Sequence, residues 1–317
     1  MLFFGIENFS QIVKELIEMV ICVGEILGDM VGARQGKHMQ IECFAGGAPF
    51  NVACCLKKLD CSCGFCGCVG KDAVGDFLLD IAEKQNFNYL RLERDNERNT
   101  TLAFVNVDDA GERTFSFYRK NTADAYLPQG AIEEITCLAD IVHIGSLPIS
   151  SESGRPFLDE LIRNAHEKGK KVSFDVNYRS NIFESEAEAT ELYQKYIEQA
   201  DIVKFSEEEL RLFSQGNSIE EMLSNVAGIH KTVLLTLGAR GSMVCANGSL
   251  NYVPAEKIDT VADTNGAGDA FMAGALSSIE AGLTDWNMIL RRANRCGALA
   301  VLQKGAYPEW GVSDITM

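Results

Sequence analysis

Short apolar runs alternate with longer segments of helical spacing along most of the chain. This alternation is the sequence form of a parallel β-sheet that is covered by helices on both faces. Several of the runs end directly in Gly, Asp or Asn, and ligands of open α/β sheets gather at the carboxyl ends of the strands. The runs that we expect to form central strands are residues 20–23, 141–144, 172–176, 202–205 and 233–236.

Two regions, 30–44 and 100–118, break this rhythm. Apolar and polar residues alternate in TLAFVNVDDAGERTFSFY, which predicts a β-hairpin with its turn at 108–111. A small antiparallel sheet built from these two regions would act as a lid that excludes water from a site. The alternative is an edge extension of the main sheet. In both cases we expect one compact domain, 19–317, rather than separable units.

Residues 1–18 are expected to be an N-terminal extension to that domain. Their apolar residues recur at helical spacing, and the segment lacks the cationic start and small-residue cleavage site of a secretory signal. Met19 directly precedes the first strong strand and is a candidate start of the natural chain.

Composition limits the partners of this domain. The chain has 317 residues, 46% of them hydrophobic, which is ample for a buried core. Its 45 acidic and 29 basic residues give a net charge of −16, a field that repels a phosphate backbone and argues against nucleic-acid partners. Charged residues interrupt every apolar run before the roughly 18 to 20 residues that would span a bilayer, so we expect no membrane partner.

Eleven cysteines, an odd number that includes adjacent Cys54 and Cys55, argue against a disulfide framework and favour the reducing cytoplasm. The only dense group lies in CSCGFCGCVG, residues 61–70. Four thiols so close together could bind zinc. The interpretation that we prefer is a Gly-rich strand whose small cysteines fill a tight core.

The most informative chemistry lies in residues 263–271, DTNGAGDAF, which precede a helix of small residues. Gly266, Ala267 and Gly268 permit close approach to a ligand, and a helix that begins there directs free backbone N–H groups and a positive dipole end at an anion. A carboxylate is a poor neighbour for phosphate unless it has a proton to accept. Asp269 therefore fits a general base, with the three residues before it as the cradle for the transferred group.

This segment resembles the DTTGAGD signature of the PfkB family of ribokinase-like carbohydrate kinases. The resemblance extends along nearly the whole chain after Met19, since GGAPFNVA at 46–53 and GEILGD at 24–29 are similar to earlier motifs of the family. It implies an α/β, ribokinase-like fold: a central, mostly parallel sheet flanked by helices, with a small antiparallel β lid. It also implies an enzyme, a carbohydrate kinase that binds ATP and a small-molecule sugar.

The resemblance assigns roles to individual positions. The residues implied to bind the sugar are Asp29, Gly46, Gly47, Asn51 and Arg179. Residue type alone would favour turn or helix caps for Asp29 and Asn51, and a surface ion pair for Arg179. The residues implied to bind the nucleotide are Lys204, Ser206, Glu209, Thr236, Gly238, Gly241 and Asn294.

Two cations are implied as well. In the family, the Glu of an Asn-x-x-Glu motif organises Mg²⁺ through water; Glu209 takes that place here, while Ser206 stands where Asn is usual. A monovalent cation, K⁺, would lie beside the cradle and be held largely by carbonyl groups. The positions implied for it are Asp263, Asn265, Ala300, Gln303 and Gly305.

Residues 111–119 and 122–124 are most similar to fructokinases and the closely related riboside kinases. We expect a fructokinase, which converts D-fructose to fructose 6-phosphate. Phe104, Phe115 and Phe117 would close over the sugar, although alternating aromatics are also typical of one buried face of a strand. Ribokinase, aminoimidazole riboside kinase and 2-keto-3-deoxygluconate kinase remain alternatives, as does an inactive sugar- or nucleotide-binding regulator. The Gly-x-Gly-x-x-Gly spacing of a dinucleotide-binding dehydrogenase is missing at 24–28. Lid sheets of related kinases pair, so we expect a homodimer.

Overall fold

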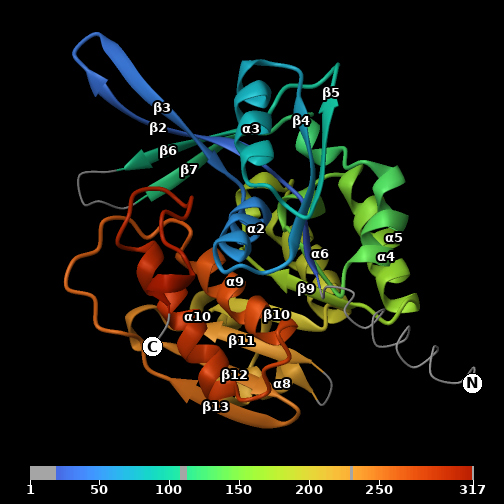
Figure 1. The fold of residues 1–317 in the computed structure, drawn as a ribbon, viewed down its shortest axis with the longest axis vertical. Coiled ribbons are helices and arrows are strands. Elements are labelled where there is room, and N and C mark those ends of the chain that lie inside the picture. Colours follow the sequence, from blue (N-terminus) through green and yellow to red (C-terminus); the bar gives the residue numbers. More distant parts are fainter. Residues whose placement is uncertain (1–18, 108–112, 229–230, 316–317) are drawn as a thin grey trace, which may run out of the picture.

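The computed structural model describes residues 19–107, 113–228 and 231–315. The expected N-terminal extension, 1–18, and the expected hairpin turn, 108–111, lie outside these ranges. Within them, helices cover a large sheet, and a small sheet extends away from it (Figure 1).

The large sheet has nine strands among the described residues, in the order β13-β12-β11-β10-β9-β8-β1-β4-β5. Its pairings are parallel from β11 to β5, and β12 and β13 add an antiparallel edge. The expected central strands and the predicted fold class are therefore confirmed. The strands are β1 Val20–Val23, β4 Cys63–Gly70, β5 Tyr89–Asp95, β8 Ile141–Ile144, β9 Lys171–Asp175, β10 Ile202–Ser206, β11 Thr232–Thr236, β12 Ser242–Ala246 and β13 Ser249–Val253.

Helices cover both faces of this sheet, which explains why the central strands are apolar throughout. In β1, Val20 and Cys22 pack in one core, with α2, α3, α9 and α10. Ile21 and Val23 pack in the other, with α4 to α8. The helices are α2 Ala48–Lys58, α3 Ala73–Lys84, α4 Ile132–Leu138, α5 Gly154–Glu167, α6 Glu186–Gln199, α7 Glu207–Phe213, α8 Ile219–Ala227, α9 Ala267–Glu280 and α10 Trp286–Ala300. Among the described residues, no helix combines the length and apolar composition needed to cross a membrane.

The small sheet has the order β3-β2-β6-β7 and projects from one end of the large sheet (Figure 1). It consists of β2 Leu27–Gln35, β3 His38–Gly46, β6 Leu102–Val107 and β7 Arg113–Tyr118. The pairs β2–β3 and β6–β7 are antiparallel, as the predicted hairpin requires, whereas β2 and β6 pair in parallel. The small sheet thus joins two hairpins that are distant in sequence.

The cysteine-rich run forms β4, as the strand interpretation predicts. Cys63 packs in the core beneath α2, whereas Cys66 packs in the core on the opposite face of the sheet. Thiols that point to opposite faces of one strand cannot share a metal ion. Burial raises the pKa of Cys63 to about 12, which keeps the thiol protonated in its core position.

Candidate active site

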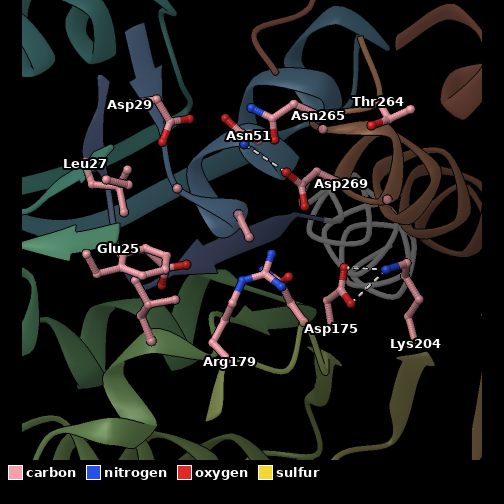
Figure 2. Close-up of a pocket in the computed structure, with 18 residues that line it drawn as sticks. Glu25, Leu27, Asp29, Asn51, Asp175, Arg179, Lys204, Thr264, Asn265 and Asp269 are labelled. Atoms are coloured by element: carbon pink, nitrogen blue, oxygen red, sulfur yellow. Dashed lines mark hydrogen bonds and ion pairs between the residues drawn. The ribbon is translucent and has the colours of Figure 1, made fainter. Parts of the chain in front are cut away.

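A cavity of about 300 Å³ opens at the carboxyl ends of β1, β9 and β10 (Figure 2). The small sheet forms one wall, through Leu27, Asp29, Ala103 and Phe117. The first turns of α2 and α9 form another wall. Of the residues expected to bind the sugar, Asp29, Gly47, Asn51 and Arg179 all line this cavity. Gly46 is not among the described residues that line the cavity. It packs against Asp29, since a Cβ atom on Gly46 would collide with the carboxylate of Asp29.

The start of α9 shows why residues 266–268 are small. Gly266 adopts a left-handed conformation with φ of 76°, and a Cβ atom on it would lie only 2.7 Å from Ala306. The first backbone hydrogen bond of the helix runs from the N–H of Ala270 to the carbonyl of Gly266, at 2.8 Å. The N–H groups of Gly268 and Asp269 precede that bond, so the positive end of the helix is directed at the cavity.

Asp269 is half-buried at this helix start and lines the cavity. Its Oδ2 accepts a hydrogen bond of 2.8 Å from Nδ2 of Asn51, in α2. Desolvation and the nearby carboxylate of Asp175 raise the pKa of Asp269 to about 6. The hydrogen bond from Asn51 and the positive side chains of Lys204 and Arg179 oppose this rise. A carboxyl with this pKa is ionised at neutral pH and is still basic enough to accept a proton.

Asp175 and Lys204 form a buried ion pair on the floor of the cavity. Nζ of Lys204 lies 2.9 Å from Oδ1 and 2.8 Å from Oδ2 of Asp175. Burial by itself lowers the pKa of Lys204, but Asp175 and Glu209 outweigh it and raise the pKa above its usual value. The ammonium therefore stays charged beside Gly268, where a Cβ atom would lie 3.0 Å from Nζ.

The start of α2 is held against β1 by a second unusual glycine. Gly47 has φ of 110°, and a Cβ atom there would lie 2.5 Å from the carbonyl oxygen of Glu25. The carbonyl of Gly47 accepts the N–H of Asn51 at 2.9 Å, which fixes the first turn of the helix. The side chain of Asn51 is thereby directed across the cavity to Asp269 (Figure 2).

A second cavity of about 620 Å³ lies on the other side of the α9 start. The expected nucleotide residues Thr236, Gly238, Gly241 and Asn294 all line it. Its remaining walls are mostly apolar and include Ile258, Val261, Phe271 and Val301, which suits a flat ring. Thr264 and Gly268 line both cavities, so the two spaces meet at the helix start.

Three of the expected nucleotide residues lie elsewhere. Lys204 lines the first cavity instead of the second. Ser206 and Glu209 form a capping box at the start of α7: Ser206 Oγ accepts the N–H of Glu209, and Glu209 Oε2 accepts the N–H of Ser206. The other oxygen of Glu209 accepts the N–H of Tyr178 at 2.8 Å. Ser206 and Glu209 are not among the described residues that line either cavity.

The positions expected to hold a monovalent cation gather in two adjacent loop segments. Asp263 joins them, since its Oδ1 accepts the N–H of Asn265 at 2.8 Å and its Oδ2 that of Gly305 at 2.9 Å. Ala300 ends α10, and its carbonyl accepts the N–H of Gln303 at 3.4 Å. The side chain of Gln303 holds the following loop, because its Oε1 accepts the N–H of Glu309 at 2.9 Å.

The small-sheet aromatics separate onto two faces. Phe117 lines the first cavity, whereas the ring of Phe104 packs against Tyr118, with centroids 5.0 Å apart. The prediction that all three aromatics cover the ligand is therefore wrong for Phe104. Its neighbour Ala103 lines the cavity, and adjacent strand positions point to opposite faces of a sheet. The side chain of Phe115 lies outside what the structure describes.

Sequence reasoning did not assign Glu25, Asp175 and Asn177, which also line the first cavity. A signal was present, since Glu25 lies just beyond β1 and the other two end or follow β9, where ligands of α/β sheets gather.

Comparisons with known proteins agree with this fold. The family model described as "pfkB family carbohydrate kinase" matches residues 17–310. The chain is 33% identical over 270 residues to a fructokinase of Vibrio alginolyticus, covering 82% of this chain and 86% of that protein. A fructokinase double mutant from Vibrio cholerae, solved with fructose, ADP and a potassium ion, superposes with a TM-score of 0.82 at 32% identity, covering 92% and 94% of the chains. An ATP-bound fructokinase from Xylella fastidiosa gives a TM-score of 0.84 at 29% identity, covering 94% and 96%.

Proposed function

Since the chain belongs to the pfkB family of carbohydrate kinases, we propose that it transfers the γ-phosphate of ATP to the 6-hydroxyl of D-fructose. The observation that carries this proposal is the position of Asp269. It lies in the small polar cavity, at the positive end of α9, where that cavity meets the larger apolar one. Fructose would occupy the first cavity and ATP the second, with the γ-phosphate at their junction.

In the proposed reaction, the carboxylate of Asp269 takes the proton from the 6-hydroxyl of fructose. The hydroxyl oxygen then forms a bond to the γ-phosphorus, and the bond from that phosphorus to the bridging oxygen of ATP breaks, so that ADP leaves. The N–H groups at the start of α9 stabilise the negative charge on the transferred group. Asn51 orients Asp269 through their hydrogen bond of 2.8 Å. Lys204 adds a positive charge beside Gly268.

We also propose Mg²⁺ and K⁺ as cofactors. Mg²⁺ would be held chiefly by the phosphates and water, because both oxygens of Glu209 already accept backbone N–H groups. The loops joined by Asp263 fit a K⁺ site made of carbonyl groups, since its carboxylate is taken up in ordering them. Both cations supply charge that offsets the negative phosphates when they are bound.

The substrate assignment is tested by measuring ATP consumption, with Mg²⁺ and K⁺ present, on a panel of sugars. The panel contains fructose, ribose, 2-keto-3-deoxygluconate, aminoimidazole riboside and glucose. We expect kcat/KM to be highest for fructose. A higher value for another sugar would replace fructose as the substrate, and no turnover on any sugar would favour an inactive binding protein of the same fold.

The pH dependence of kcat/KM for fructose follows from the pKa of Asp269. The base is active when it is deprotonated, and its pKa is about 6. We therefore expect log(kcat/KM) to rise with a slope near one up to a pH of about 6 and to level off above it. A profile that is flat between about pH 5 and 7 would contradict the assignment of Asp269 as the base.

The remaining expectations are proposals of the same kind. The small sheet would act as a lid, because it contributes four residues to the wall of the sugar cavity. Exposed Met39, Ile41 and Tyr118 on that sheet support its pairing in a homodimer. All eleven cysteines are free, which supports a reducing cytoplasmic location.

A further inference from the structure

Glu25 is a buried carboxyl at the sugar cavity to which neither the sequence motifs nor the proposed mechanism gives a role. It follows β1, and only 1% of its surface is exposed, although it lines the cavity. Figure 2 shows Glu25 and Leu27 on one side of the cavity, across from Asp269, Asp175 and Lys204. It therefore lies at the end of the cavity away from the proposed site of phosphate transfer.

Neither carboxyl oxygen of Glu25 has a hydrogen-bond partner in any other residue that the structure describes. A buried polar group without a partner destabilises a protein, so such groups are rare in folded chains. The fold nevertheless leaves space for this one. A Cβ atom at Gly145 would lie 2.5 Å from Oε2 of Glu25 and 2.8 Å from Pro49, so only glycine fits at that position.

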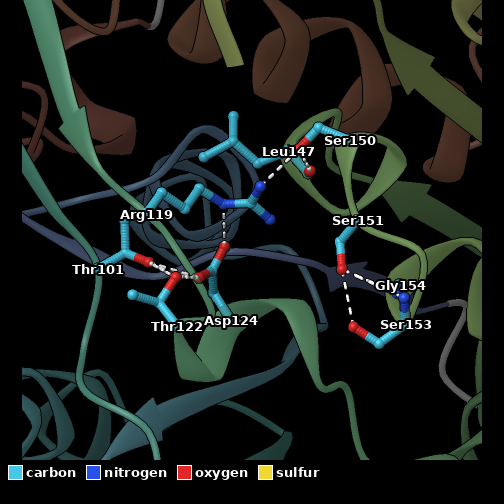
Figure 3. A network of polar contacts seen from close by, with 9 residues as sticks. All are labelled: Thr101, Arg119, Thr122, Asp124, Leu147, Ser150, Ser151, Ser153 and Gly154. Atoms are coloured by element: carbon cyan, nitrogen blue, oxygen red, sulfur yellow. Dashed lines mark hydrogen bonds and ion pairs between the residues drawn. The ribbon is translucent and has the colours of Figure 1, made fainter. Parts of the chain in front are cut away.

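Asp124 and Arg119, whose charges act on Glu25, form their hydrogen bonds within a separate network (Figure 3). Asp124 accepts hydrogen bonds from Arg119 Nε at 2.6 Å and from Thr122 Oγ1 at 2.8 Å. Arg119 also donates to Ser150 at 2.5 Å. Nη2 of Arg119 is a further buried atom that lacks a partner among the described residues. This network therefore places the Arg119–Asp124 ion pair near Glu25 without using either carboxyl oxygen of Glu25.

We infer that Glu25 binds a hydroxyl group of the sugar, at a carbon other than the one phosphorylated, and so helps to select the substrate. The inference rests on the proposed function, because it needs a sugar in the first cavity. A bound hydroxyl would supply the partner that the carboxyl lacks in the free protein.

The protonation state of Glu25 suits this role. Burial, only partly offset by its own backbone N–H, raises the pKa of Glu25 to about 8. At neutral pH the carboxyl is therefore largely protonated, and it can donate one hydrogen bond and accept another. A sugar hydroxyl both donates and accepts, so the two groups can satisfy each other without a charge being buried.

The test compares Glu25→Met, which keeps the length of the side chain and removes its polar atoms, with Glu25→Gln, which keeps a donor and an acceptor. The matched control is Ser62→Ala, because Oγ of Ser62 is another buried atom without a partner and lies at the opposite end of the strands, before β4. For each variant, KM for fructose, KM for ATP and the thermal unfolding midpoint are measured.

We expect Glu25→Met to raise KM for fructose by roughly 10- to 100-fold, with less than about a twofold change in KM for ATP. Its unfolding midpoint should be unchanged or higher, because an unpartnered carboxyl is lost. KM for fructose in Glu25→Gln should stay within about fivefold of the wild-type value. KM for fructose in Ser62→Ala should equal the wild-type value.

Fructose analogues that lack the hydroxyl at C1, C3 or C4 then identify the contact. Wild type should lose roughly 10- to 100-fold on one analogue, and Glu25→Met should not distinguish that analogue from fructose. Equal discrimination by wild type and Glu25→Met on every analogue would overturn the inference. So would an unchanged KM for fructose in Glu25→Met, or a failure of that variant to fold. If wild type does not phosphorylate fructose at all, the proposed function falls first and the inference falls with it.

Discussion

Replacing Asp269 by Asn should lower kcat by ~10²-fold or more while leaving KM for fructose and for ATP nearly unchanged. The amide is almost the same size as the carboxylate, and its oxygen can still accept the hydrogen bond from Asn51. What the variant loses is the ability to take a proton. Steady-state kinetics with fructose and ATP, together with the thermal unfolding midpoint, would check this expectation.

The matched control is Asp76→Asn. Asp76 lies in the first turn of α3, as Asp269 lies in the first turn of α9, but Asp76 lines neither cavity. Both changes remove one carboxylate from a helix start, so the two variants are matched. The control should retain wild-type kcat, because Asp76 lines neither cavity. If Asp269→Asn kept kcat within about tenfold of the control, Asp269 could not be the base.

Replacing Lys204 by Met should reduce the free energy of unfolding by about 3–5 kcal/mol, because it leaves the carboxylate of Asp175 buried without its counter-charge. Both side chains are less than one-tenth exposed, at 7% and 4%. The double variant Lys204→Met with Asp175→Leu should recover most of that loss, since it removes the charge that the single change leaves unpaired. Urea unfolding of wild type and the variants measures these differences.

An exposed pair provides the comparison for this experiment. Lys84 and Asp80 form an ion pair on α3 with 68% and 57% of their side chains exposed. Lys84→Met should leave the urea midpoint almost unchanged, because solvent screens that pair. A loss in Lys204→Met no larger than in Lys84→Met, or a double variant as unstable as the single one, would show that burial does not make the Asp175–Lys204 pair important.

The large sheet could be predicted from the sequence because its central strands are buried on both faces. Such strands are apolar at every position, and β1 shows why: Val20 and Ile21 face different cores. The small sheet was also predictable, through its alternating pattern. The parallel pairing of β2 with β6 was not, because it joins segments distant in sequence and leaves no local signal.

The candidate site was predictable where backbone geometry demands a particular residue. Gly47 and Gly266 stand at positive φ, and each marks a helix start that faces a cavity. Ser206 and Glu209 show the opposite case. Their spacing is that of a helix capping box as well as of a cation motif, and in the structure their polar atoms bond to backbone. Glu25 lies within the motif at 24–29, but the motif gives it no role, because its significance lies in partners that are missing from its surroundings.

The shared boundary of the two cavities at Thr264 and Gly268 has a consequence for inhibitor design. A single molecule that carries a sugar-like group and an adenine-like group, connected by a short linker past Gly268, could occupy both spaces at once. Once one group is bound, the other is held at an effective concentration in the millimolar range, so two weak fragments would combine into a tight ligand. Tight binding of such a bisubstrate compound would test the proposal that sugar and nucleotide meet at this boundary.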